Sequence, residues 1–267
     1  MDCELNSLVI GYPGHVVAGP MDAVLRSGEL CCLLGANGAG KSTLLRTLSA
    51  FQRPLSGEIR IDNEPLSSLS PQMLSTRLGI VLTERVRPTG MTVRDMAGMG
   101  RSPYTNFWGR QSAEDRQKVD EALRLVGIEE LAERQVTTLS DGERQKVMIA
   151  KVLAQETPII LLDEPTAFLD FPSKVETMLL LRRLAREMNK TILLSTHDLD
   201  LALQTADRLW LMAKAQPLRT GTPKALAEEG ILSAYFPGRH IAFDAEALRF
   251  AIRLTGETDG STYGEND

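Results

Sequence analysis

One short segment constrains this chain more than any other. Residues 35–42, with the sequence GANGAGKS, fit the pattern G-x-x-x-x-G-K-[ST] between the apolar run Leu30 to Leu34 and the helix-like stretch Thr43 to Leu48. Glycines let consecutive backbone N–H groups turn inward around a phosphate, and the following helix N-terminus adds about half a positive charge. The segment therefore predicts a loop that holds the phosphates of a nucleotide. The expected contacts are Gly35, Ala36, Asn37, Gly38, Ala39, Gly40, Lys41, Ser42 and Thr43.

Two acidic residues supply the second half of the expected site. Asp163 and Glu164 follow the apolar run Ile159 to Leu162, and ligands of α/β sheets bind at the carboxyl ends of such strands. We expect Lys41 to reach the β- and γ-phosphates. Ser42 and Asp163 are the expected Mg²⁺ ligands, and Glu164 is expected to orient or deprotonate the attacking water.

The order of apolar runs indicates an α/β fold. Further strands are expected at Leu78 to Leu82 and at Thr191 to Ser195, with an amphipathic stretch, Ser173 to Asn189, before the latter. Strand, helix and strand in this order form a unit with a parallel sheet. The segment from Glu4 to Leu34 is expected to form strands joined by turns.

A helical block interrupts this core. Ser112 can cap a helix that Gly127 ends, and a second helix is expected from Asp141 or Gly142 to Ala154. We place the block at residues 83–155. The core has two parts, residues 1–82 and residues 156–240, and the first part includes antiparallel strands. Residues 241–267 form a C-terminal extension. Its tail, 256–267, has an acidic composition typical of disorder.

Composition narrows the class of protein. The chain has 267 residues, of which 43% are hydrophobic, and a net charge of −5 that argues against nucleic acid as a partner. No apolar stretch approaches the roughly 18 residues that span a bilayer, and Asp2 and Glu4 stand where a secretory signal would be basic. Cys31 and Cys32 lie in an apolar run and are expected to be core thiols. These features favour a cytoplasmic location.

Several further segments resemble one family. Residues 139–143, LSDGE, open a helix between the two nucleotide motifs, where they resemble the LSGGQ signature of ABC ATPases. Tyr12 falls where that family has an aromatic residue that stacks on adenine. Residues 167–170, AFLD, match its D-loop, and residues 195–198, STHD, match the segment of its switch histidine. The resemblance implies an α/β P-loop NTPase core with an antiparallel β subdomain and an inserted α-helical subdomain.

The resemblance also implies a mechanism. ATP and Mg²⁺ would bind between two copies of the chain, arranged head to tail. Ser140 and the backbone N–H groups at Gly142 would meet the γ-phosphate held by the other copy. Asp170 would act in the D-loop, and His197 would sense the γ-phosphate.

Two positions depart from the family pattern. Asp141 replaces a glycine of the signature and places a carboxylate near a triphosphate, where repulsion could weaken ATP capture. The glutamine that the family places after the strand at Leu78 to Leu82 is missing. Thr83 stands there and is our expected Mg²⁺ contact, with Glu84 as the alternative.

The subgroup within the family is indicated by three segments. Residues 91–95, MTVRD, residues 99–104, MGRSPY, and the stretch Arg144 to Ala150 after the signature resemble the ATPases of importers for ferric siderophores, haem and vitamin B12. That resemblance implies two transmembrane permease subunits as partners, a substrate-binding protein that acts indirectly, and a peripheral position at the cytoplasmic face of the inner membrane. Alternatives are the ATPase of another ABC transporter and a non-transport ABC regulatory module with weak turnover.

Overall fold

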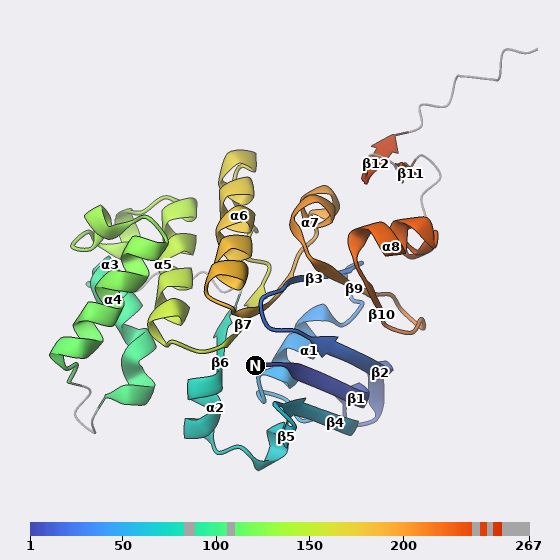
Figure 1. Ribbon diagram of the computed structural model, residues 1–267, viewed down its shortest axis with the longest axis horizontal. Coiled ribbons are helices and arrows are strands. Elements are labelled where there is room, and N and C mark those ends of the chain that lie inside the picture. The colour runs from blue at the N-terminus through green and yellow to red at the C-terminus, as the bar shows by residue number, and fades with distance from the viewer. Residues whose placement is uncertain (83–88, 106–109, 237–240, 245–247, 253–267) are drawn as a thin grey trace, which may run out of the picture.

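The computed structural model describes residues 1–82, 89–105, 110–236, 241–244 and 248–252 (Figure 1). Two sheets form its centre. The larger one has six strands in the order β10-β9-β3-β8-β7-β6, in which only β10 runs antiparallel to its neighbour. Its strands are β3 (Leu30–Gly35), β6 (Leu78–Val81), β7 (Ile159–Asp163), β8 (Thr191–Ser195), β9 (Arg208–Met212) and β10 (Arg219–Gly221).

The smaller sheet is antiparallel, in the order β2-β1-β4-β5. Its strands are β1 (Cys3–Tyr12), β2 (His15–Leu25), β4 (Ser56–Ile61) and β5 (Glu64–Pro65). Helix α1 (Lys41–Leu48) lies between the two sheets, and its buried Leu44, Leu45 and Leu48 share a core cluster with Leu5 and Leu8 of β1. This burial fixes the helix that begins at the end of the glycine loop.

Strand β3 is apolar on both faces because both faces are covered. Leu30, Cys32 and Leu34 face one core cluster, whereas Cys31 and Leu33 face the cluster around α1. The prediction that Cys31 and Cys32 are core thiols is confirmed, since both are buried and free. Burial raises the pKa of the Cys31 thiol, which keeps it neutral.

Three helices form a block at the left of Figure 1: α3 (Val93–Gly98), α4 (Ala113–Leu125) and α5 (Asp141–Ala154). Each begins with a capping box, in which the N-cap side chain and the third helical residue bond each other's backbone N–H. Gly127, with a φ of 70°, follows α4 as expected. A buried ion pair between Arg101 and Asp115, 2.9 Å long, fixes the 3-10 helix Met99–Tyr104 to α4.

The other helices cover the sheet or extend the chain. Before β6 comes α2 (Pro71–Arg77), and α6 (Phe171–Glu187) packs on β3 and β8. After these follow α7 (Leu199–Thr205), α8 (Pro223–Glu228), α9 (Ile231–Tyr235) and a hairpin of β11 (Ile241–Asp244) and β12 (Arg249–Ile252). Among the helices of the described segments, none is long and apolar enough to cross a bilayer.

The predicted fold class is confirmed, with small corrections at element ends. The helix expected from Thr43 begins at Lys41, because Gly40 is its N-cap. The helix expected from Ser173 to Asn189 spans Phe171–Glu187, because Asp170 caps it and Pro172 fits its first turn. The acidic tail, 256–267, lies outside the described residues.

Candidate functional site

The loop between β3 and α1 is shaped by its glycines. Gly40 has a φ of 102° and is an N-cap without a side-chain hydrogen bond. A Cβ on Gly35 would lie 2.3 Å from the Met212 carbonyl oxygen, and one on Gly40 would lie 2.6 Å from Cγ1 of Val17. Larger residues therefore do not fit. The N-terminal N–H groups of α1 receive no cap from a side chain, which suits an anion.

Lys41 is a buried cation beside this loop. Its Nζ donates to the carbonyl oxygens of Gly35 at 2.7 Å and Ala36 at 3.4 Å, and the residue is only 6% exposed. Burial lowers the pKa of Lys41, whereas the carboxylates of Glu164 and Asp163 favour its charged form. An ammonium held at the loop mouth by neutral carbonyls is well suited to bind a phosphate.

The carboxylate of Asp163 meets two hydroxyl groups. Ser42 Oγ lies 3.4 Å from Asp163 Oδ1, and Ser195 Oγ donates to the same oxygen at 2.7 Å. The parallel pairing of β7 and β8 sets Asp163 directly opposite Ser195. A carboxylate and a hydroxyl at the edge of the sheet are the oxygen donors that Mg²⁺ prefers, so the residues present fit that ion.

Glu164 and His197 form the most direct contact of the site. Glu164 Oε1 lies 2.5 Å from His197 Nε2, although the two residues follow different strands, β7 and β8. Glu164 has a φ of 49°, the left-handed region, and its N–H donates to Ser195 Oγ at 2.9 Å. The structure thus places an acid, an imidazole and a buried lysine around the end of one sheet.

The signature segment lies at the start of α5, which belongs to the helical block, whereas α1 lies between the sheets (Figure 1). The Glu143 N–H donates to Ser140 Oγ at 3.2 Å, and the Ser140 N–H donates to Glu143 at 2.7 Å. Among the described residues, the recorded partners of the Ser140 and Asp141 side chains are Glu143 and Arg144 of the same helix. The structure of one copy therefore does not bring this segment to the glycine loop.

Asp141, which replaces a glycine of the signature, pairs with a residue that the sequence analysis missed. Arg144 donates to Asp141 Oδ1 at 2.6 Å and to the Leu139 carbonyl at 2.8 Å. The side chain of Arg144 is 13% exposed, against 43% for Asp141. A spacing of three residues on a helix could have revealed this pair. The extra negative charge of Asp141 is compensated within the same chain.

Asp170 caps helix α6, whose first turn lies beside Gly142. The Ser173 N–H donates to Asp170 Oδ1 at 3.0 Å, and hydrogen bonds from the Ser173 hydroxyl and N–H lower the pKa of Asp170. A Cβ on Gly142 would lie 3.2 Å from Ser173 Oγ. The starts of α5 and α6 are therefore adjacent. Thr83 and Glu84, the two candidates for the missing glutamine, lie outside the described residues.

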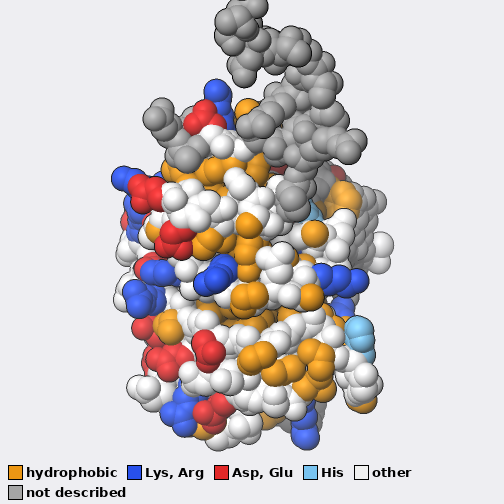
Figure 2. Space-filling view, turned by 90° about the vertical axis from the view of Figure 1, so that its right-hand side faces the viewer, with side chains coloured by type: hydrophobic (Ala, Val, Ile, Leu, Met, Phe, Trp, Pro, Cys, Tyr) orange, Lys and Arg blue, Asp and Glu red, His pale blue; other side chains and the backbone are white. Residues whose placement is uncertain are grey.

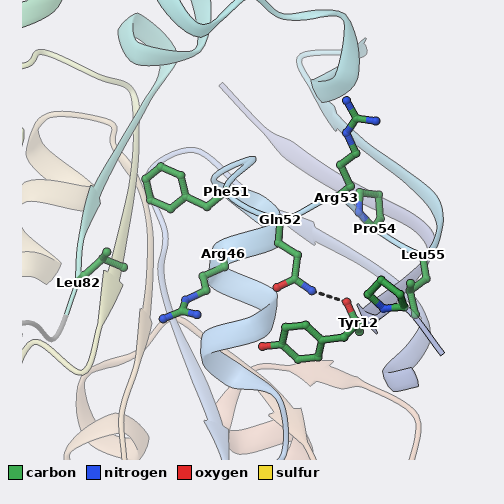
Figure 3. A pocket seen from close by; sticks show the side chains of 10 residues that line it. Tyr12, Arg46, Phe51, Gln52, Arg53, Pro54, Leu55 and Leu82 are labelled. Carbon is green, nitrogen blue, oxygen red and sulfur yellow. Dashed lines mark hydrogen bonds between the residues drawn. The ribbon is translucent and has the colours of Figure 1, made fainter. Parts of the chain in front are cut away.

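Tyr12 lines an open pocket of about 580 Å³ at the end of α1 (Figure 3). In Figure 3 its ring lies beside α1, and Gln52 donates to the Gly11 carbonyl. Phe51, Leu55 and Arg46 line the same pocket, and Phe51 is 66% exposed. Tyr12 is half-exposed, so part of its side chain is accessible to a ligand.

Charged side chains are mixed on the face shown in Figure 2. Lysine and arginine side chains are interspersed with acidic and apolar ones. Among the described residues of this face, no continuous basic field is visible.

The chain belongs to the ABC transporter family, whose model matches residues 19–167. Its cassette binds ATP, and the chain is an ATPase of the ABC type. The matched region includes the glycine loop, the signature and Asp163 with Glu164. The resemblance inferred from the sequence is thus confirmed.

Three curated relatives cover most of this chain. An uncharacterised ABC transporter ATP-binding protein of Methanocaldococcus jannaschii is 40% identical over 87% of this chain and 80% of its own length. The ferric enterobactin transport ATP-binding protein FepC of Escherichia coli is 34% identical over 90% of this chain and 88% of its own. The cobalamin import ATP-binding protein BtuD of Halobacterium salinarum is 33% identical over 96% of this chain and 63% of its own.

Solved structures share the fold. CbiO1 of Clostridium perfringens, part of the ABC transporter complex cbiONQ, has a TM-score of 0.74 and 30% identity over 87% of this chain and 93% of its own. A bacterial ABC transporter cassette solved as a dimer has a TM-score of 0.71 and 27% identity over 82% of this chain and 98% of its own.

Proposed function

We propose that this chain is the ATPase subunit of an importer for an iron complex, a siderophore or haem, or for vitamin B12. The contact between Glu164 and His197 beside the buried Lys41 carries the proposal, because it assembles a base, its partner and a phosphate-binding cation from three strand ends. The cargo class is supported by the relatives named for ferric enterobactin transport and cobalamin import, and by the segment 99–104.

The residues of the loop divide the work of holding ATP. Backbone N–H groups of residues 35–43 would surround the phosphates, and Lys41 would leave its carbonyl partners to bind the β- and γ-phosphates. Tyr12 would stack on the adenine. Ser42 and Asp163 would hold Mg²⁺ together with Thr83 or Glu84, and the ion would neutralise phosphate charge when bound.

Glu164 would accept the proton of the attacking water, and His197 would bind the γ-phosphate and hold the Glu164 carboxylate in place. In this chain the left-handed backbone at Glu164 directs its side chain toward His197. Asp170 would fix the D-loop at the start of α6.

A second copy of the chain would complete each site. Ser140, Asp141 and Gly142 stand at a helix N-terminus outside the loop's own contacts, and a related cassette forms a dimer. In a head-to-tail pair the Ser140 hydroxyl and the Gly142 N–H would meet the γ-phosphate of the other copy. Arg144 would hold the Asp141 carboxylate away from it.

The end of the α1 pocket that holds Phe51 and Leu82, which lies away from Tyr12 in Figure 3, would receive a permease segment, whereas the Tyr12 end would receive adenine. The pocket is lined by exposed apolar side chains and by Leu82, next to the position of the missing glutamine. Two permease subunits would hold two copies of the chain at the cytoplasmic face of the membrane, with the substrate-binding protein on the other side. The units 1–82, 83–155, 156–240 and 241–267 would then serve nucleotide binding, coupling, catalysis and an accessory role.

The experiment separates transport from hydrolysis. Phe51→Glu should abolish uptake of the labelled cargo, because docking of the permease would bury the new charge. The ATPase rate of the purified chain should stay within about twofold, because the side chain is exposed when no permease is bound. Met188→Glu, a matched change of an exposed apolar residue elsewhere, should affect neither. Uptake of labelled ferric siderophore, haem and cobalamin is then measured in cells that lack the chain and in the same cells supplied with the parent or a variant. If none depends on the chain, the cargo proposal is wrong, and normal uptake by Phe51→Glu would exclude this docking site.

A further inference from the structure

Ser195 is a buried hydroxyl that none of the roles above uses. It ends β8 after the fully apolar residues Ile192, Leu193 and Leu194, and it has no solvent exposure. A hydroxyl buried in such surroundings is costly unless it is hydrogen-bonded. Its partners therefore explain why a serine is suited to this position.

The Ser195 hydroxyl joins the two acidic residues of the site. It donates to Asp163 Oδ1 at 2.7 Å and accepts the Glu164 N–H at 2.9 Å. The parallel register, with Asp163 opposite Ser195, brings the groups together. One side chain thus fixes the carboxylate of Asp163 and the peptide group of Glu164 at the same time.

The second bond matters because the Glu164 backbone is unusual. A non-glycine residue at a φ of 49° is held in a sparsely populated region, and such a conformation persists only when its surroundings hold it. The Ser195 oxygen binds the N–H that this conformation presents. The same conformation leads the Glu164 carboxylate to His197, 2.5 Å away.

The first bond matters for the neighbouring oxygen ligands. Ser42 approaches the same Asp163 oxygen at 3.4 Å, so Ser195 restricts the rotation of the carboxylate that Ser42 shares. Hydrogen bonds to a metal-binding carboxylate commonly change metal affinity or activity by about 10- to 100-fold.

We propose that Ser195 is a positioning residue for ATP hydrolysis: its hydroxyl aligns Asp163 for Mg²⁺ and holds the backbone that aims Glu164 at His197. This inference rests on the proposed roles of Asp163 and Glu164. Ser195 acts through these two groups and touches neither the nucleotide nor the ion.

The test compares two serine-to-alanine changes. Ser195→Ala should lower kcat about 10-fold or more and raise the Mg²⁺ concentration for half-maximal binding of a fluorescent ATP analogue about 10-fold. Binding of the analogue in EDTA should stay within about twofold, because the phosphate loop is intact. Ser49→Ala is the matched control, since Ser49 is also buried but donates to the Leu45 carbonyl of α1. It should leave all three quantities within about twofold of the parent.

Further variants separate positioning from folding. Ser195→Thr keeps the hydroxyl and should restore most of the rate and the Mg²⁺ requirement, whereas Ser195→Val should resemble Ser195→Ala. The proposal is overturned if Ser195→Ala keeps kcat and Mg²⁺ dependence within twofold. It is also overturned if binding in EDTA falls in parallel with the melting temperature, or if Ser195→Thr is no better than Ser195→Val.

Glu164→Gln, assayed in parallel, distinguishes a failure of the proposed role of Glu164 from a failure of the inference on Ser195. Parental turnover in Glu164→Gln would remove the proposed base, and the inference on Ser195 with it. Loss of turnover in Glu164→Gln together with an indifferent Ser195→Ala would overturn only the inference.

Discussion

Two helix N-termini of this protein face phosphate in the proposed dimer, and they are built in opposite ways. Helix α1 begins at Gly40 with no side-chain cap and no acidic residue in its first turn. Helix α5 begins at Ser140 with a complete capping box and with Asp141 and Glu143 in its first turn. The first is open to an anion in a single chain, whereas the second already bonds two of its backbone N–H groups, those of Ser140 and Glu143. The difference suggests that α1 captures ATP and that α5 contributes only when a second copy brings phosphate to it.

The largest expected effect is a loss of ATP binding at the start of α1. Lys41→Ala should lower ATP affinity of the single chain well over tenfold, above about 1.4 kcal/mol, because it removes the buried cation of the loop. Titration with a fluorescent ATP analogue measures this. Lys224→Ala, an exposed lysine on α8, should bind normally. Unchanged affinity in Lys41→Ala would refute the role of the loop.

Sequence alone predicts the α1 site because its signals are contiguous. The glycines, Lys41 and the flanking apolar run lie within a dozen residues, and their chemistry requires one local geometry. The same holds for the capping serines Ser112 and Ser140, each with its acid three residues later.

The remaining features depend on three-dimensional pairing. Ser195 meets Asp163 only through the register of β7 and β8, which the apolar sequences of the two strands do not specify. The contact of Glu164 with His197 likewise needs a left-handed residue at position 164, a conformation that glutamate rarely adopts. Such contacts follow from the packed fold rather than from local pattern.

The next largest effect is expected at the start of α5, where a substitution should lower turnover but not ATP binding. Ser140→Ala should lower turnover about tenfold while ATP binding by the single chain stays within about twofold, since the hydroxyl would meet only the other copy's phosphate. Ser112→Ala removes the same type of cap from α4, so it serves as the control for lost helix stability, about 1 kcal/mol. Equal loss of turnover in both variants would leave Ser140 with a structural role only.

A smaller effect sharpens the account of Asp141. Arg144→Ala should weaken ATP-dependent dimerisation about fivefold, because Asp141 would then face the triphosphate unpaired. Asp141→Gly should remove most of this penalty when combined with Arg144→Ala. Sedimentation can measure the dimerisation constant with ATP for the parent, the two single variants and the double variant, which together form a double-mutant cycle. Additive effects would contradict the proposed pairing.

The smallest effect concerns the capping box itself. Hydrogen bonds from the Ser140 N–H and hydroxyl lower the pKa of Glu143 below its ordinary value of 4.5. A lowered carboxyl pKa stabilises the fold at neutral pH, and this contribution is lost as the pH falls through the folded pKa. Glu143→Gln should cost less than about 1 kcal/mol at pH 7, and the difference from the parent should shrink toward pH 4. Urea unfolding at both pH values measures it; a difference that grows on acidification would have the wrong sign.

The most direct test of the two-sided site uses Glu164→Gln, which keeps the shape of the side chain but removes the base. Size-exclusion chromatography with ATP and Mg²⁺ should show this variant as a dimer that turns over at least about 100-fold more slowly than the parent, and as a monomer when Lys41→Ala is added. A variant that stays monomeric with ATP bound, or that hydrolyses ATP at the parental rate, would contradict the account.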